Sequence, residues 1–182
     1  MTRLTDTQIK DKTIAWIRSF IIEYNICPFA KHTVKEGTLE IDVVHPNNTE
    51  QALEVTMSTI LRMDDNSQIE TALLVFPSAF TSFDDYLDFV SFAEELLRMS
   101  GYEGICQLAT FHPHYCFADT LENDVSNYTN RSPYPLLHIL RESSIEKAIA
   151  YYGDTSKIPD NNIATMHKLG LDKITALLKN LK

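Results

Sequence analysis

The chain has 182 residues, is 44% hydrophobic and 23% charged, and carries a formal net charge of -9 at pH 7. Its length and composition predict one ordinary globular domain over residues 1–182. The negative charge argues against a nucleic-acid binder or an anionic-membrane binder, because such proteins gather Lys and Arg on one face and no basic run occurs here. No apolar run approaches the ~20 residues that a membrane-spanning helix needs.

The cysteines indicate a reducing compartment. Cys27, Cys106 and Cys116 are odd in number, form no CxxC pair, and follow an N-terminus without a signal-like apolar stretch. We therefore expect free thiols in a cytoplasmic protein.

The first half of the chain alternates helical and strand patterns. A capping box at Thr5, followed by apolar residues at helical spacing, predicts a long helix that ends near Asn25, before Pro28. Period-2 alternation over residues 39–44 predicts a half-exposed edge strand, and residues 49–62 have the pattern of a second helix.

The middle of the chain continues this alternation. The short apolar run at residues 71–76, TALLVF, is typical of a central strand that helices cover on both faces. A third helix begins at Thr81 and ends before Gly101, and a third strand follows over residues 104–110. Such alternation predicts a layered α/β fold with a small, mostly parallel sheet of about three or four strands, covered by helices.

The last third of the chain has a different pattern. Residues 119–130 are polar and aperiodic, so we expect a loop there, able to cover a neighbouring site. Helices are predicted over residues 133–142, 144–152 and 161–181, which gives the fold a helical C-terminal part. The first of these helices follows from Ser132 at the N-cap and Pro133 at the first helical position.

Proline follows each predicted strand, at Pro46, Pro77 and Pro113. Because proline cannot donate to a strand ladder, the three strands should stop with their carboxyl ends side by side, where ligands bind in open α/β sheets. We therefore expect a pocket at the carboxyl ends of the strands. The simpler alternative is that proline only terminates each strand.

His112 and His114 flank Pro113. On an extended backbone their side chains point the same way, ~6.5 to 7 Å apart. Two imidazoles at that spacing are candidates for general acid and base, or for part of a metal site. The alternative is a pair of hydrogen-bonded histidines at a strand end. Since no HExxH or CxxC pattern is present, we assign no metal ligand and leave the cofactor open.

Arg131 is the candidate for holding an anion. It precedes the predicted helix start, where Pro133 and Pro135 remove backbone donors, so a carboxylate or phosphate would depend on its guanidinium. Asn130 and Ser132 flank it and complete the predicted substrate-binding segment.

In the predicted helix 133–142, Tyr134, His138 and Arg141 stand at i, i+4 and i+7 and would share one face. We assign Tyr134 and His138 to the catalytic group and Arg141 to substrate binding; the alternative is a solvated surface stripe. In the segment NICPFAK, Cys27 and Lys31 are further substrate-binding candidates. Cys27 is either an activated thiolate or a packed, inert thiol.

Four segments in order, NICPFAK, LLVFP, QLATFHPHYCFA and NRSPYPLLHILRE, resemble the domain-of-unknown-function family 1415, a mainly bacterial family without a settled activity. The resemblance covers nearly the whole chain. It implies a complete single-domain protein, and it transfers no catalytic roles.

The leading hypothesis is an enzyme of hydrolase or lyase type that acts on a small anionic metabolite. His112, His114, Tyr134 and His138 would supply acid-base chemistry, and Arg131 would hold the carboxylate or phosphate. A noncatalytic small-molecule sensor that uses the same pocket is the first alternative. A protein interaction module, with an exposed apolar patch and no enclosed cavity, is the second. The sequence does not determine the oligomeric state.

Overall fold

The computed structural model describes residues 4–179, whose strands form a four-stranded mixed sheet in the order β1-β2-β4-β3. β1 (Leu39–Val43) and β2 (Thr71–Val75) pair in parallel. β4 (Leu136–Arg141) is antiparallel to both of its neighbours, β2 and β3 (Cys106–Phe111). The predicted layered α/β fold is therefore confirmed, with β1, β2 and β3 sharing one direction.

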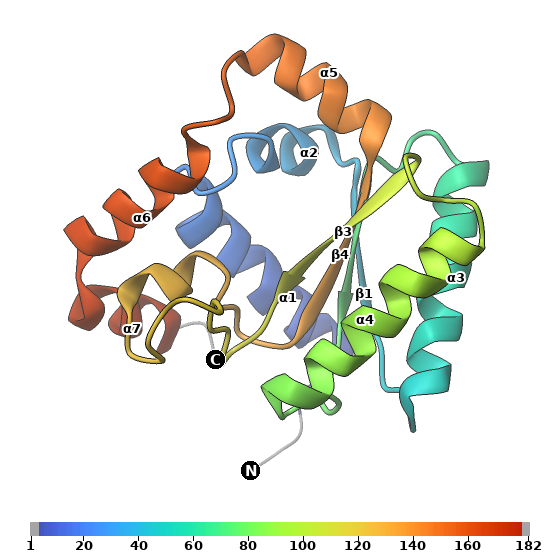
Figure 1. Ribbon diagram of the computed structural model, residues 1–182, viewed down its shortest axis with the longest axis horizontal. Helices are drawn as coiled ribbons and strands as arrows, with labels where there is room; N and C mark the ends of the chain where they lie inside the picture. Colours follow the sequence, from blue (N-terminus) through green and yellow to red (C-terminus); the bar gives the residue numbers. More distant parts are fainter. Residues whose placement is uncertain (1–3, 180–182) are drawn as a thin grey trace.

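Helices cover both faces of this sheet (Figure 1). α3 (Thr49–Asp65) and α4 (Phe83–Met99) lie on one side. α1 (Asp6–Trp16) lies on the other side, together with α6 (Ile158–Leu169) and α7 (Leu171–Lys179) of the C-terminal part. The sheet therefore separates two apolar cores, one under α3 and α4 and one under α1.

β2 shows how the two cores are divided. All five of its residues are buried, as predicted for a central strand. Ala72 and Leu74 belong to the core under α3 and α4, whereas Leu73 and Val75 belong to the core under α1. This is the alternation of side chains that a pleated strand requires. β1 lies at one edge of the sheet and is half-exposed, also as predicted.

The first helix changes character in its second half. α1 starts at the predicted capping box, in which the Thr5 side chain accepts from the Gln8 N–H and the Gln8 side chain accepts from the Thr5 N–H. It continues as a π-helix, η1 (Ile17–Ile22), and Asn25 then takes a left-handed backbone with φ of 52°. π-Helical turns are rare and frequently occur at functional sites. The segment after α1 is therefore a first indication of where a site lies.

The prediction of a helix over residues 133–142 is wrong, because this segment forms the inner strand β4. Pro133 and Pro135 disfavour helical backbone at Ser132 and Tyr134, the residues that precede them. The segment that remains, LLHILR, is only six residues long, a typical strand length and too short for most helices. β4 also fills the place between β2 and β3, so the sheet is mixed.

The C-terminal helices agree more closely with the prediction. α5 (Glu142–Tyr152) follows β4 directly. The single helix predicted over residues 161–181 is two helices, α6 and α7, because Gly170 between them takes φ of 74°, a conformation that favours glycine. A short helix that we did not predict, α2 (Ala30–Glu36), follows Pro28. Within residues 4–179, none of the helices has the length and apolarity to cross a membrane.

Candidate functional site

A pocket of about 620 Å³ lies on the α1 side of the sheet; we call it the α1-face pocket. Its floor is the sheet, and its walls come from α1, η1, the segment around α2, and α5. Its walls are mainly apolar, and five aromatic residues line it: Trp16, Phe29, Phe111, Tyr151 and Tyr152. A concave, mostly apolar cavity with a few polar groups is the usual form of a small-molecule site.

The α1-face pocket opens at a different edge of the sheet from the one expected. Leu39 and Thr71 line it at the amino ends of β1 and β2, and Leu140 lines it near the carboxyl end of β4. These ends meet because β4 runs antiparallel to β2. A strand that was predicted as a helix therefore brings its own residues to this pocket.

His138 is the central polar group of the pocket. It lies in the middle of β4, opposite Leu73 on one side and Ala109 on the other. Leu73 faces α1, so the imidazole faces α1 as well. Its Nε2 forms a short hydrogen bond with the Thr71 hydroxyl. The Thr71 hydroxyl has one hydrogen, and it donates that hydrogen to the Ile139 carbonyl, 2.9 Å away. Nε2 must therefore carry the proton and donate to Thr71.

This arrangement leaves the other ring nitrogen of His138 as an acceptor. Nδ1 has no hydrogen-bond partner within residues 4–179, and this atom is not fully buried. Its lone pair is therefore open to the pocket. Burial lowers the pKa of His138 from 6.5 to about 4. The imidazole is neutral at physiological pH and can accept a proton from a bound molecule.

Cys27 lines the same pocket as His138. Burial raises the pKa of the thiol, and hydrogen bonds from the backbone N–H groups of Phe29 and Ala30 only partly oppose this effect. The sulfur is therefore a neutral thiol at physiological pH rather than an activated thiolate. Of the two alternatives for Cys27, the structure favours the packed thiol, although the residue is half-exposed and faces a cavity.

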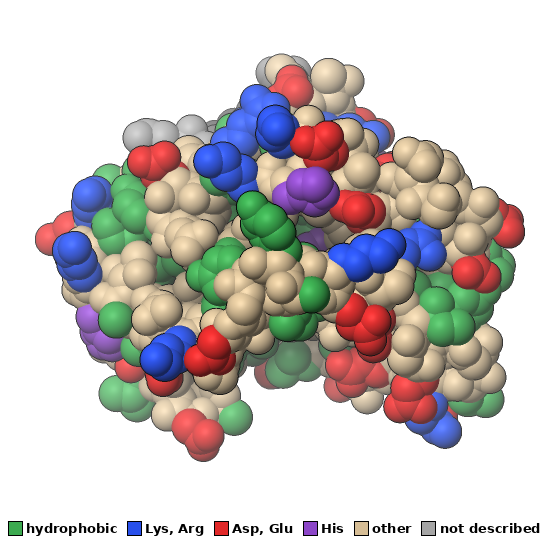
Figure 2. All heavy atoms as spheres, turned by 90° about the horizontal axis from the view of Figure 1, so that it is seen from above, with side chains coloured by type: hydrophobic (Ala, Val, Ile, Leu, Met, Phe, Trp, Pro, Cys, Tyr) green, Lys and Arg blue, Asp and Glu red, His purple; other side chains and the backbone are tan. Residues whose placement is uncertain are grey.

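Polar residues stand at the mouth of the pocket. Glu70 accepts a hydrogen bond of 2.8 Å from the Thr38 hydroxyl, and the His32 imidazole lies 4.0 Å from its carboxylate. Lys147 of α5 is exposed beside them. Figure 2 looks onto this end of the molecule, where hydrophobic side chains lie near the centre of the view and charged side chains surround them. The mouth is thus polar and the interior apolar.

Several residues of this pocket had no recognisable signal in the sequence. Thr71 is the first residue of an apolar strand, and nothing in its neighbours marks it as a partner of His138. Ile17 and Ile21 line the pocket from the π-helix. Trp16 lines it too, and its Nε1 is buried without a hydrogen-bond partner in the described part of the chain. Only the unusual backbone of η1 and Asn25 points to this region.

Tyr134, His138 and Arg141 do not share a helix face, because they lie in and beside a strand. Tyr134 packs in the core under α1, where burial raises its pKa. Arg141 directs its guanidinium toward the carbonyls of Met63, Asn66 and Ile69, at and beyond the C-terminus of α3. This contact places a positive charge at the negative end of the helix dipole. Arg141 is therefore a helix cap, even though part of the residue lines the pocket.

Replacing Arg141 with alanine should lower the free energy of unfolding by about 2 kcal/mol, because a charged donor to several carbonyls is lost. Lysine at this position should restore only part of the lost stability, because it lacks the planar guanidinium group. Urea denaturation measures both. Arg98→Ala is the control, because Arg98 is exposed and its one ion pair within residues 4–179 is with Glu95 in the same helix. An Arg141→Ala variant as stable as the wild type would contradict the capping role of Arg141.

His112 and His114 lie at the opposite edge of the sheet. The His112 side chain is fully buried, and its Nε2–H donates to the Phe80 carbonyl at 2.9 Å. Its Nδ1 accepts from the backbone N–H of His114 at 3.0 Å, which leaves neither ring nitrogen available to a ligand. Burial lowers its pKa. His114 is exposed, and the two rings are 5.8 Å apart.

Arg131 is occupied by the loop that was expected to cover a site. Its Nε donates to the Tyr115 carbonyl at 3.0 Å and its guanidinium to the Glu122 carbonyl at 2.7 Å, and it stacks over the Tyr128 ring. The same loop is tied together by the buried side chain of Asn127.

The neighbours of Arg131 also make bonds within the protein. Asn130 donates to the Thr110 carbonyl, and Ser132 donates to the Tyr134 carbonyl. Lys31 is exposed on α2. The two histidines, Arg131, Asn130 and Ser132 therefore share a neighbourhood, but none of them lines the α1-face pocket.

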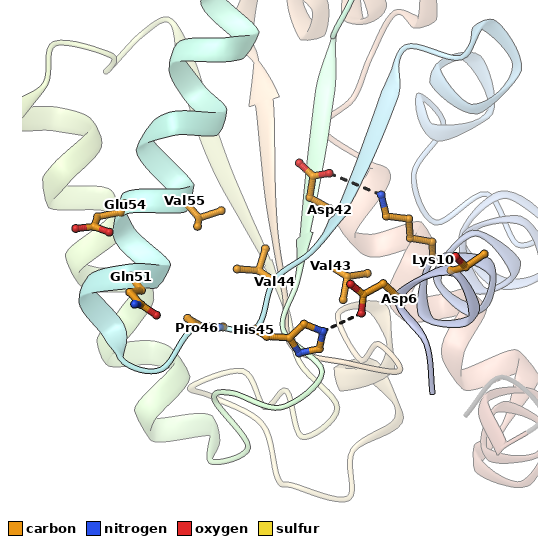
Figure 3. A pocket seen from close by; sticks show the side chains of 11 residues that line it. Asp6, Lys10, Asp42, Val43, Val44, His45, Pro46, Gln51, Glu54 and Val55 are labelled. Atoms are coloured by element: carbon orange, nitrogen blue, oxygen red, sulfur yellow. Dashed lines mark hydrogen bonds and ion pairs between the residues drawn. The ribbon is translucent and has the colours of Figure 1, made fainter. Parts of the chain in front are cut away.

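A second pocket, of about 700 Å³, does lie at the carboxyl end of β1, between α1 and α3 (Figure 3). It is more open than the α1-face pocket, and its charged groups face one another. His45 pairs with Asp6 at 2.9 Å, and Lys10 pairs with Asp42 at 3.8 Å. Because these side chains already bond to one another, fewer of them are available to a charged ligand.

Within residues 4–179, no three His, Cys, Asp or Glu side chains are grouped so that they could hold a metal ion. Comparisons with curated proteins and with solved structures found no match. The model of one protein family, described as "Protein of unknown function (DUF1415)", matches residues 8–176. That match spans α1 to α7 and includes every group that lines the α1-face pocket. The chain therefore belongs to the DUF1415 family, as its four characteristic segments indicated.

Proposed function

We propose that this protein is an enzyme that binds a small, mainly apolar molecule in the α1-face pocket and uses His138 as its general base. The observation that carries the proposal is the open Nδ1 of a neutral imidazole at the floor of an apolar cavity. A general base must be deprotonated at the working pH and within reach of the proton it removes. The fixed orientation of the ring supports this role.

Three candidates from the sequence line this cavity. Arg141 caps α3, and the other two, Cys27 and His138, support the proposal. Arg131 is not available to the anion that the sequence predicted there, because its side chain donates hydrogen bonds to the Tyr115 and Glu122 carbonyls. The apolar walls of the α1-face pocket instead favour a ligand that buries carbon surface.

Alkylation of Cys27 can locate ligand binding. A thermal-shift screen of small apolar compounds should yield hits, because a ligand at 100 times its dissociation constant stabilises the native state by about 2.7 kcal/mol. Hits that occupy the α1-face pocket should also slow the reaction of Cys27 with a neutral maleimide. Peptide mass spectrometry reads each cysteine separately, and Cys116 serves as an internal control because it does not line the pocket. Stabilising compounds that leave the Cys27 rate unchanged would bind elsewhere and would contradict the assignment.

Catalysis is tested on the same compounds. The wild type should convert at least one protecting compound, as seen by mass spectrometry, and His138→Asn should still be protected at Cys27 but should lose the conversion. If the wild type protects Cys27 and returns every compound unchanged, the noncatalytic binding protein is the correct function. If His138→Asn converts the compound as fast as the wild type, His138 is not the base.

A further inference from the structure

The Thr71–His138 pair determines which polar group a ligand can present to the floor of the pocket. The Thr71 hydroxyl donates its only hydrogen to the Ile139 carbonyl. It can then only accept from His138, and this fixes the tautomer with the proton on Nε2. Both Thr71 and His138 are held by the strand ladder between β2 and β4. The pairing of β2 with β4 therefore keeps Nδ1 as a hydrogen-bond acceptor.

A ligand that reaches Nδ1 must bring a hydrogen. A carboxylate or an ether oxygen would place its lone pairs against the lone pair of the nitrogen, and neither group could form a bond there. A hydroxyl or an N–H group would donate to it. The walls add a second requirement, because Trp16 and Phe111 stand edge to face with ring centroids 5.6 Å apart beside the imidazole, and Phe29 and Tyr152 form a similar pair 5.9 Å apart. Such walls favour an aromatic body.

We propose, on the basis of the proposed function, that the ligand is a neutral aromatic compound with a hydroxyl or N–H group that donates to His138 Nδ1. Thr71 is the positioning residue that imposes this selectivity through the tautomer of His138. The small anionic metabolite predicted from the sequence is not the ligand of this pocket. A donor next to an open base is also the group whose proton His138 would remove, so recognition and proton transfer use the same atom.

Three probes of similar shape separate the possibilities: 2-naphthol, 2-methoxynaphthalene and 2-naphthoate. At neutral pH the first is a neutral donor, the second lacks the donor, and the third is an anion. Calorimetric titration of the wild type should show 2-naphthol binding about tenfold more tightly than 2-methoxynaphthalene, the value of one buried hydrogen bond. 2-Naphthoate should bind most weakly. In Thr71→Val, Nε2–H loses its acceptor and the tautomer is released, so the preference should fall to within about threefold. Thr71→Ser keeps the hydroxyl and should therefore retain the tenfold preference for 2-naphthol.

The outcomes distinguish this inference from the proposed function. Equal binding of 2-naphthol and 2-methoxynaphthalene, with both protecting Cys27 from alkylation, would overturn donor selectivity and leave the pocket intact. Tightest binding of 2-naphthoate would overturn it in favour of an anion site. Failure of all three probes to bind would remove the inference and count against the proposed function together.

A ligand-free measurement covers the case in which Thr71→Val does not fold. The ¹⁵N chemical shifts of the His138 ring in the wild type report which nitrogen carries the proton. The Nε2–H tautomer is expected at neutral pH. A predominant Nδ1–H tautomer would overturn the inference, whatever the probes show.

Discussion

Replacing His112 with alanine should lower the free energy of unfolding by about 3–4 kcal/mol, because the change empties a buried site and breaks two hydrogen bonds. The ring is fully buried between Phe83 and Tyr86, with ring centroids 5.2 Å from each. Its two nitrogens join the Phe80 carbonyl to the backbone of His114. Alanine would leave this carbonyl and this N–H without their partner. Urea denaturation at neutral pH measures the loss.

His114→Ala is the matched control. His114 is exposed, and the bond to His112 comes from its backbone N–H, which alanine retains. Its stability should therefore stay within about 0.5 kcal/mol of the wild type. The sequence hypothesis, in which His112 is catalytic, requires the opposite pattern: lost turnover with almost unchanged melting. A His112→Ala protein that melts like the wild type would favour that hypothesis over a role in the fold.

Stability should fall on acidification from neutral pH to about pH 4, and His138 should account for as much as about 3 kcal/mol of the loss. Burial lowers the pKa of His138 from 6.5 to about 4 in the folded protein. Between these two values the unfolded chain binds a proton that the folded chain does not bind. Stability therefore rises with pH through this window and is lost as pH falls. The pKa of His112 is also lowered by burial and should add to the same trend.

Urea denaturation at a series of pH values tests this linkage. His138→Gln should reduce the dependence on pH in the range from about 6.5 to 4, because the titrating group is gone. His32→Gln is the control, since His32 is exposed at the mouth of the same pocket. Carboxyls with a lowered pKa, such as those of Asp124 and Asp154, lose their contribution only at lower pH. An unchanged profile in His138→Gln would contradict the buried neutral imidazole.

Local sequence patterns predicted most of the helices and strands of this fold. The capping box at Thr5, the edge strand near residue 40 and the buried run at residues 71–76 are local signals, and each lies where it was predicted. β4 was predicted as a helix because Ser132 and Pro133 also suit a helix start, and a short apolar run does not by itself distinguish the two structures. The position of β4 between β2 and β3 depends on contacts with β2, whose residues lie more than sixty positions earlier in the chain.

The candidate site was only partly predictable. Cys27 and His138 could be selected by residue type, and the structure brings both to one pocket. Arg131 and His112 were selected by the same reasoning, but their polar atoms bond to backbone groups of the protein itself. Residue type indicates what a side chain can do, whereas hydrogen-bond partners decide whether its polar atoms remain available.

By itself, the sequence determined the layered α/β class, the family, and a short set of polar residues with suitable chemistry. Only the tertiary structure decided which of these residues meet, because β4 pairs with β2 and so places His138 beside Thr71, sixty-seven positions earlier in the chain. The physical reason is the range of the interactions. Helix caps and strand periodicity act over a few neighbours along the chain, whereas a tautomer, a pKa and a cavity depend on distant segments packed together.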